Sequence, residues 1–77
     1  MMPPLPILRG RELVAIFERF GWNVVRQQGS HIILTKDGSM ATLSIPAHKA
    51  VARGTLRGLI RAADLSVQEF LSTYEAG

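Results

Sequence analysis

The chain has 77 residues, no cysteine and a formal net charge of +3. Its length allows one small core and excludes a second domain, and the absence of cysteine excludes disulfide bonds and thiolate zinc sites. Because no apolar run is long enough for a membrane span or a secretory signal, the sequence predicts a single cytoplasmic domain over residues 1–77 with no membrane partner.

The first two expected segments are a lead-in and a helix. Residues 1–7 are rich in proline, which donates no backbone hydrogen bond, so we expect this segment to be a frayed lead-in. Four apolar side chains then recur at helical spacing, which predicts an amphipathic helix over Arg11–Phe20 that ends at Gly21. The apolar positions of this helix are Leu13, Ile16, Phe17 and Phe20.

Three strands are expected after the helix. Trp22–Gln27 is rich in β-forming residues, and the apolar run His31–Thr35 follows it after a Gly-Ser turn signal, which predicts a hairpin. A third strand, Ala41–Ile45, comes after an Asp-Gly turn and ends at a proline.

Alternation along the second strand gives its two faces different characters. Ile32 and Leu34 share one face, whereas His31, Ile33 and Thr35 share the other. Helices on one side of a single-layer sheet bury the more apolar set. We therefore expect His31 on the open face of the sheet.

Two helices are expected at the end of the chain. Thr55 is the expected N-cap of a short helix that carries Arg57 and Arg61 on its outer side. Its apolar stripe is Leu56, Leu59, Ile60 and Ala63. The capping box Ser66–Glu69 begins a last helix that runs through Tyr74. The order α-β-β-β-α-α predicts an α+β fold in which helices pack on one face of a three-stranded antiparallel sheet.

Proton transfer is the chemistry that this sequence can support best. A histidine takes or gives a proton near neutral pH, as required when the 2′-hydroxyl of RNA attacks the adjacent phosphate. His31 begins a strand directly after Gly29 and Ser30, a tight turn whose backbone N–H groups can contact phosphate. An ordinary exposed histidine after an ordinary turn is the alternative explanation of these three residues.

Other catalytic classes find little support in the sequence. No serine, histidine and acid pattern of a known nucleophile elbow is present, and no acidic pair stands at metal-ligand spacing near a histidine. We therefore expect chemistry without a metal or another cofactor.

The basic residues are unevenly distributed. All nine lysines and arginines lie within residues 1–62, whereas residues 63–77 contain only acidic charges. A basic body favours a polyanionic partner, although solubility alone also explains such charges. His48 lies in the connection between the third strand and the helix capped by Thr55, where its side chain either reaches the site of His31 or remains solvated. Four basic residues surround the start of this helix, and they either hold phosphate or simply cover the outer face of the helix: Lys49, Arg53, Arg57 and Arg61.

Four short motifs follow one another along the chain. They are Gly29-Ser30-His31 after a Gly-Trp strand, Ile45-Pro46-Ala47-His48, Gly54-Thr55-Leu56-Arg57, and Ala63-Asp64-Leu65-Ser66 with Phe70 behind it. In this order, from about Leu8 to about Tyr74, they resemble the HicA toxin family.

The resemblance implies a fold like that of double-stranded-RNA-binding domains and the activity of an mRNA interferase. Such a protein is the toxin of a type II toxin–antitoxin pair, acts on mRNA and is held inactive by a HicB-like antitoxin. The catalytic histidine of the family's Gly-Ser-His motif falls on His31, with Gly29 and Ser30 as its turn. No catalytic role is carried over to His48.

Two positions depart from the family pattern. Asp64 stands where a glycine is common, so we expect a looser turn between the last two helices or a capping role for Asp64. Gly10 stands where a hydroxyl residue often caps the first helix, which should cost about a few tenths of a kcal/mol.

The working hypothesis is a metal-independent endoribonuclease in which His31 is the general acid or base and His48 is the first candidate for its partner. One alternative is an RNA-binding module that binds without cleaving. A second alternative is a protein-interaction domain, which forms a stable complex and has no affinity for RNA after its partner is removed.

Overall fold

The computed structural model describes residues 4–77 and confirms the predicted order of elements. These are α1 (Gly10–Glu18), β1 (Asn23–Gln28), β2 (His31–Thr35), β3 (Thr42–Pro46), α2 (Arg53–Ala62) and α3 (Val67–Ala76). The strands form one antiparallel sheet in the order β1-β2-β3, so the predicted α+β class is correct. No helix within residues 4–77 is long and apolar enough to cross a membrane.

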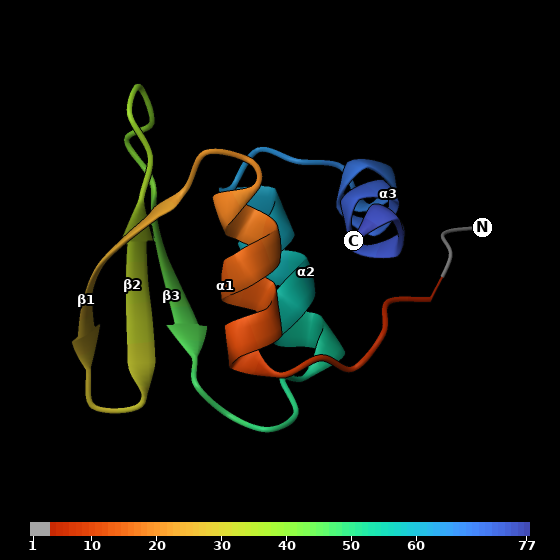
Figure 1. Ribbon diagram of the computed structural model, residues 1–77, viewed down its shortest axis with the longest axis horizontal. Coiled ribbons are helices and arrows are strands. Elements are labelled where there is room, and N and C mark those ends of the chain that lie inside the picture. The colour runs from red at the N-terminus through yellow and green to blue at the C-terminus, as the bar shows by residue number, and fades with distance from the viewer. Residues whose placement is uncertain (1–3) are drawn as a thin grey trace.

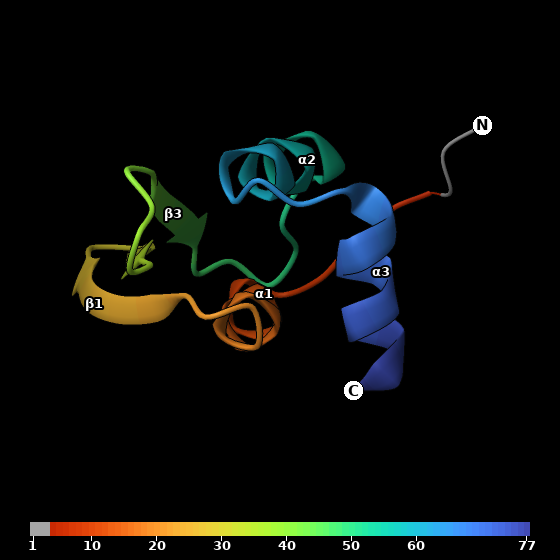
Figure 2. The same cartoon turned by 90° about the horizontal axis from the view of Figure 1, so that it is seen from above.

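The elements form three layers (Figures 1 and 2). Helices α1 and α2 lie side by side against one face of the sheet, and α3 crosses behind them on the side away from the sheet. The opposite face of the sheet is not covered by any helix within the described residues. This arrangement leaves one face of the sheet available to a partner or substrate.

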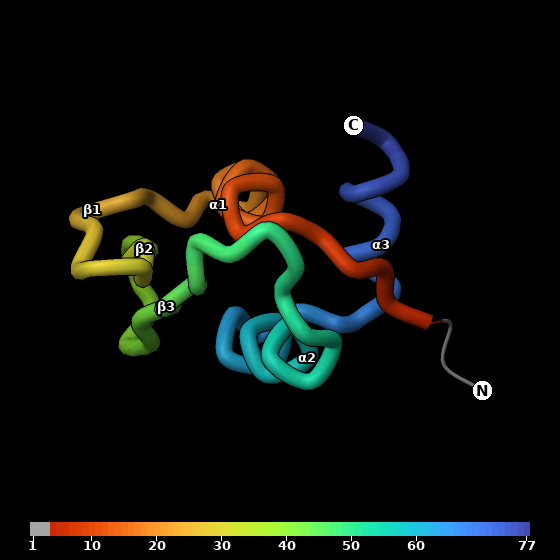
Figure 3. The backbone as a smooth tube through the Cα atoms, turned by 90° about the horizontal axis from the view of Figure 1, so that it is seen from below, coloured from red at the N-terminus to blue at the C-terminus, as the bar shows by residue number. Residues whose placement is uncertain are grey.

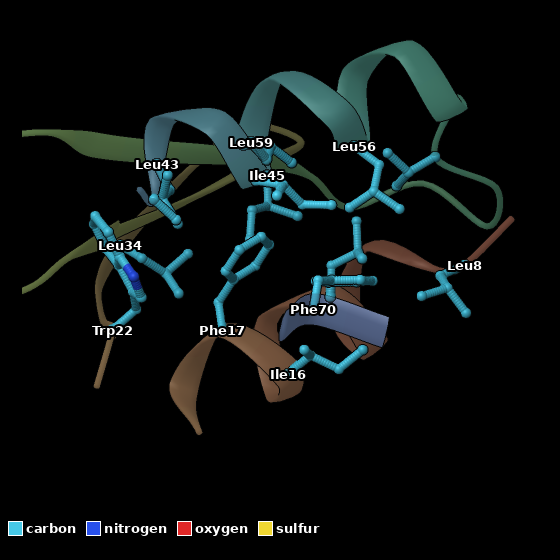
Figure 4. Close-up of a cluster of buried hydrophobic side chains, with 14 of the residues drawn as sticks. Leu8, Ile16, Phe17, Trp22, Leu34, Leu43, Ile45, Leu56, Leu59 and Phe70 are labelled. Atoms are coloured by element: carbon cyan, nitrogen blue, oxygen red, sulfur yellow. The ribbon is translucent and has the colours of Figure 1, made fainter. Parts of the chain in front are cut away.

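The core lies between the sheet and the helices (Figure 4). The whole predicted stripe of α2 is buried, as are three of the four predicted apolar positions of α1, while Phe20 is only partly buried. Phe17 of α1 meets Phe70 of α3, with ring centroids 5.8 Å apart and ring planes tilted by 47°. This aromatic contact attaches the outer helix to the rest of the core.

The segment before α1 differs from the frayed lead-in that we expected. Residues 1–3 lie outside the described part of the chain, but Leu5 is only 1% exposed. The guanidinium of Arg53 donates from Nε to the Leu5 carbonyl at 2.6 Å. Leu8 forms a β-bridge with Val51, and Figure 3 shows these two segments side by side. From Leu5 onwards the segment therefore packs on the core.

Two of the three predicted helix starts are wrong. The N-cap of α1 is Arg9, and Gly10 is the first helical residue. The N-cap of α2 is Ala52, so Thr55 lies inside the first turn, and the residue before this cap, Val51, forms the bridge with Leu8. A threonine in a first turn and one at a cap look alike in sequence. The capping box at Ser66 is confirmed: its hydroxyl accepts from the N–H of the third helical residue at 3.0 Å.

Asp64 neither loosens the turn between α2 and α3 nor caps α3. Its N–H donates to the Arg61 carbonyl (3.0 Å) and the Leu65 N–H donates to the Ile60 carbonyl (3.1 Å), which closes the turn as a Schellman motif. Asp64 has φ +59, the left-handed conformation that glycine adopts without strain. The end of α1 is closed in the same way with Gly21, at φ +96. The conformation explains why a glycine suits position 64.

Asp64→Gly should therefore stabilise the protein by about 0.5–1 kcal/mol, because it removes the strain of a left-handed L-residue. Chemical denaturation of the two proteins measures this difference. Asp64→Ala is the matched control, since it removes the same charge and keeps the strain. An equal gain in both variants would mean that charge, and not backbone conformation, limits stability at this position.

Candidate functional site

His31 lies at the start of β2, directly after a two-residue turn. Gly29 has φ +57 and Ser30 does not have a positive φ, the pattern of a type II′ hairpin turn. The imidazole is exposed, on the face of the sheet that the helices leave open, as predicted. Pairing with Gln28 on one side and Pro46 on the other fixes the backbone of His31 at the sheet end.

Ser44 is a neighbour of His31 that sequence reasoning did not single out. Its Oγ lies 3.3 Å from the Nδ1 of His31, within hydrogen-bonding distance. Ser44 pairs with Ile33 across the sheet, so it stands diagonally from His31 on the same face. The alternation of β3 and the pairing register together would have indicated this contact, but the register becomes known only with the fold.

Ile33 departs from the expectation that this face of the sheet is open to solvent. It shares that face with His31, yet its side chain is only 7% exposed and does not belong to the main core cluster. It lies on the central strand, between Arg26 on β1 and Ser44 on β3. The aliphatic stem of an arginine covers apolar surface readily. The open face thus has a small apolar centre with His31 at one end.

Backbone hydrogen bonds hold the loop after β3 against both the β1–β2 turn and the start of α1. The Ala47 N–H donates to the Ser30 carbonyl at 2.6 Å, and the Gly10 N–H donates to the His48 carbonyl at 2.9 Å. Gly10 approaches the Pro46 carbonyl so closely that a Cβ at this position would overlap its oxygen. The Gly-Ser-His and Pro-Ala-His motifs therefore meet at one end of the molecule, the lower end in Figure 1.

The basic residues that the sequence predicts as phosphate-binding lie on different parts of the surface. His48 and Lys49 line a shallow pocket of about 140 Å³, together with Arg9, Ala47 and Arg11. Sequence reasoning missed these two arginines, because they stand almost forty positions before the loop that they face.

The arginines of α2 lie elsewhere. Arg53 uses its guanidinium on the Leu5 carbonyl, and its role here is to hold the segment before α1. Arg57 and Arg61 are exposed, as predicted, but they line another pocket, at the turn between α2 and α3, together with Asp64. The structure thus brings His48 and Lys49 beside the His31 hairpin and leaves Arg57 and Arg61 in a different group.

Within residues 4–77, no three histidine or acidic side chains lie together as they would around a metal ion. The chemistry that these residues can supply is proton transfer by imidazole and charge stabilisation by the basic side chains.

Comparison with protein-family models identifies a family for most of the chain. A family model described as the HicA toxin of bacterial toxin–antitoxin systems matches residues 10–65, which is more than half of the chain. The matched region extends from the start of α1 to the turn between α2 and α3, and includes both histidines. No curated protein matches the chain.

Proposed function

Because this chain belongs to the HicA toxin family of bacterial toxin–antitoxin systems, we propose that it is an mRNA endoribonuclease in which His31 transfers a proton. The observation that carries the proposal is the exposed imidazole of His31, held at a strand end by pairing on both sides within the Gly-Ser-His motif. The structural parts that such an activity needs are a fixed proton-transfer group and cationic side chains near it.

The proposed reaction uses the 2′-hydroxyl of RNA as the nucleophile. A base removes the proton of this hydroxyl, its oxygen attacks the adjacent phosphorus, and the bond between phosphorus and the 5′-oxygen breaks. An acid protonates the leaving 5′-oxygen, and the other product ends in a 2′,3′-cyclic phosphate. His31 is the base or the acid in this scheme, and His48 is the first candidate for the other role. No step requires a metal ion.

Ser44 supports this assignment by fixing the imidazole of His31. A hydrogen bond at Nδ1 holds the plane of the ring and leaves Nε2 for the substrate, and the hydroxyl can either donate to Nδ1 or accept from it. If the hydroxyl donates to Nδ1, the proton of the neutral ring is on Nε2, which can donate a hydrogen bond to the phosphate. If Nδ1 of the neutral ring donates to the hydroxyl, Nε2 is free to act as a base. The acid form of His31 is the imidazolium, in which both nitrogens carry protons and Nδ1 donates to the hydroxyl.

The family also implies an antitoxin partner. We propose that this partner is HicB-like and that it covers the open face of the sheet, where the apolar Ile33 and the exposed His31 lie together. A partner bound there blocks access of RNA to His31 and adds stability to a small domain by mass action.

The proposal is tested by incubating the isolated protein with single-stranded RNA in excess EDTA and analysing the product ends. Cleavage that leaves 2′,3′-cyclic phosphates is the expected result. Binding of RNA without products would make the protein a non-catalytic RNA-binding module. No affinity for RNA would favour a domain that only contacts other proteins.

Ser44→Ala should lower the cleavage rate by about two- to tenfold, the value of one solvent-accessible hydrogen bond. Steady-state cleavage rates measure this effect. Thr42→Ala is the matched control, because Thr42 lies on the same face of β3 and pairs with Thr35 at the far end of β2 from His31. A loss that is as large in Thr42→Ala as in Ser44→Ala would show that the hydroxyl of Ser44 does not act through His31.

A further inference from the structure

Four cationic or protonatable residues line one small pocket near the end of the sheet at which His31 lies. Its lining consists of Arg9 and Arg11 from the start of α1, and Ala47, His48 and Lys49 from the loop after β3. None of these five residues is acidic. Three formal positive charges around one pocket repel one another, and a bound anion relieves that repulsion.

The two segments that carry these side chains are held together by their backbones. The Gly10 N–H donates to the His48 carbonyl (2.9 Å), and the Val51 N–H donates to the Leu8 carbonyl (2.8 Å). Arg9 and Lys49 stand between these two bonds and are exposed. The pocket is thus formed by fixed backbone, and its charges remain accessible to solvent.

Glu12, the acid nearest to Arg9 and Arg11 in the sequence, does not line this pocket. Glu12 accepts the backbone N–H of Arg9 at 2.9 Å, and its side chain lines a different pocket, between α1 and α3. Arg9 and Arg11 therefore line the pocket without a carboxylate among its other lining residues.

The pocket adjoins the His31 hairpin on two sides. Ala47, in its wall, donates its N–H to the Ser30 carbonyl, one residue before His31. Arg11 also lines the neighbouring hollow with Gln27 of β1, near the other end of the same turn. The bond between Ala47 and Ser30 thus joins a wall of the pocket to the residue that precedes His31.

We infer that Arg9, Arg11 and Lys49, with His48 in the wall of their pocket, form a binding site for an RNA phosphate next to the position of cleavage. The inference rests on the proposed function, because it takes RNA as the ligand. It assigns binding to the two arginines at the start of α1, its N-cap Arg9 and Arg11, in contrast to Arg57 and Arg61 of α2, which line the pocket that contains Asp64.

The test measures RNA affinity in the His31→Ala background, in which the RNA should remain intact. Fluorescence anisotropy with a labelled single-stranded RNA is recorded over a range of salt concentrations. Adding Arg9→Gln and Arg11→Gln should weaken binding about tenfold at low salt. It should also reduce the slope of log affinity against log salt by about 0.7, the contribution of one single-strand phosphate.

Arg57→Gln with Arg61→Gln is the matched control, since it removes the same charge from the other group of arginines. We expect a smaller loss of affinity and a smaller change in slope. Equal effects in the two double variants would overturn the inference, because net charge would then explain both. Lys49→Gln tests the pocket from its other wall and should weaken binding in the same direction; unchanged binding in this variant would also contradict the inference.

The affinity measurements test the phosphate site separately from the proposed cleavage activity. If the wild-type protein cleaves no RNA but the Arg9 and Arg11 variants lose affinity, the proposed activity is wrong and the phosphate site stands. If the wild-type protein cleaves RNA and these variants bind it normally, the activity stands and the phosphate site is wrong.

Discussion

Replacing His31 with alanine should lower the rate of RNA cleavage by roughly 10²–10⁴-fold, the usual contribution of a positioned acid or base. The side chain is exposed at the open face of the sheet, so its loss leaves no cavity in the core. Stability should therefore change by no more than about 0.5 kcal/mol. Cleavage assays in EDTA, together with denaturation curves, separate the two effects.

His48→Ala is the informative companion to His31→Ala. If His48 is the second proton-transfer group, the bell-shaped pH profile of kcat/KM should lose one of its limbs in this variant. A profile with both limbs would remove His48 from the reaction and leave it as a lining residue of the basic pocket. Full activity in His31→Ala would contradict the central assignment, whatever the result for His48.

Gly10→Ala should destabilise the protein by about 1–3 kcal/mol, although alanine is the better helix former. An added Cβ would overlap the Pro46 carbonyl oxygen and press on Ala47, so the backbone of the loop has to move. Because that loop is bonded to the Ser30 carbonyl, its displacement also reaches the His31 hairpin. Misplacement by about 1 Å can lower a rate about 10²-fold, so cleavage should fall together with stability.

Gly58→Ala provides the matched control in α2. Nothing lies within 4 Å of a Cβ added at this position, and the residue is exposed in the helix interior. The same substitution should stabilise the protein here by about 0.5–1 kcal/mol and leave cleavage unchanged. If Gly10→Ala were also stabilising, the close approach of α1 to the loop after β3 would not be a constraint on the fold.

Local patterns in the sequence were sufficient for the order of elements and for much of the core. Apolar spacing predicted α1 and the buried stripe of α2, because burying one face of a helix requires that spacing regardless of the remaining fold. The capping box at Ser66 was predictable for a similar reason, since both of its hydrogen bonds join residues three positions apart. The exposed position of His31 followed from strand alternation.

The errors and omissions concern contacts between distant parts of the chain. Gly10 suggests a missing helix cap when the first helix is considered alone, but its contact is with Pro46. Leu5 follows prolines that suggest fraying, and only the fold brings Arg53 to its carbonyl. Ser44 reaches His31 through a cross-strand diagonal. In each case the deciding partner is at least thirteen positions away, beyond the range of helical and strand periodicity.

The loop between β3 and α2 is held by backbone atoms: the Ala47 N–H, the His48 carbonyl and the Val51 N–H. Any residue except proline supplies the same groups, so exposed positions such as Lys49 and Ala50 can be exchanged at little cost in stability. The fold therefore does not constrain the identity of these side chains. Related chains can vary in these side chains on an unchanged backbone, and a designer can randomise them without first adding stabilising substitutions.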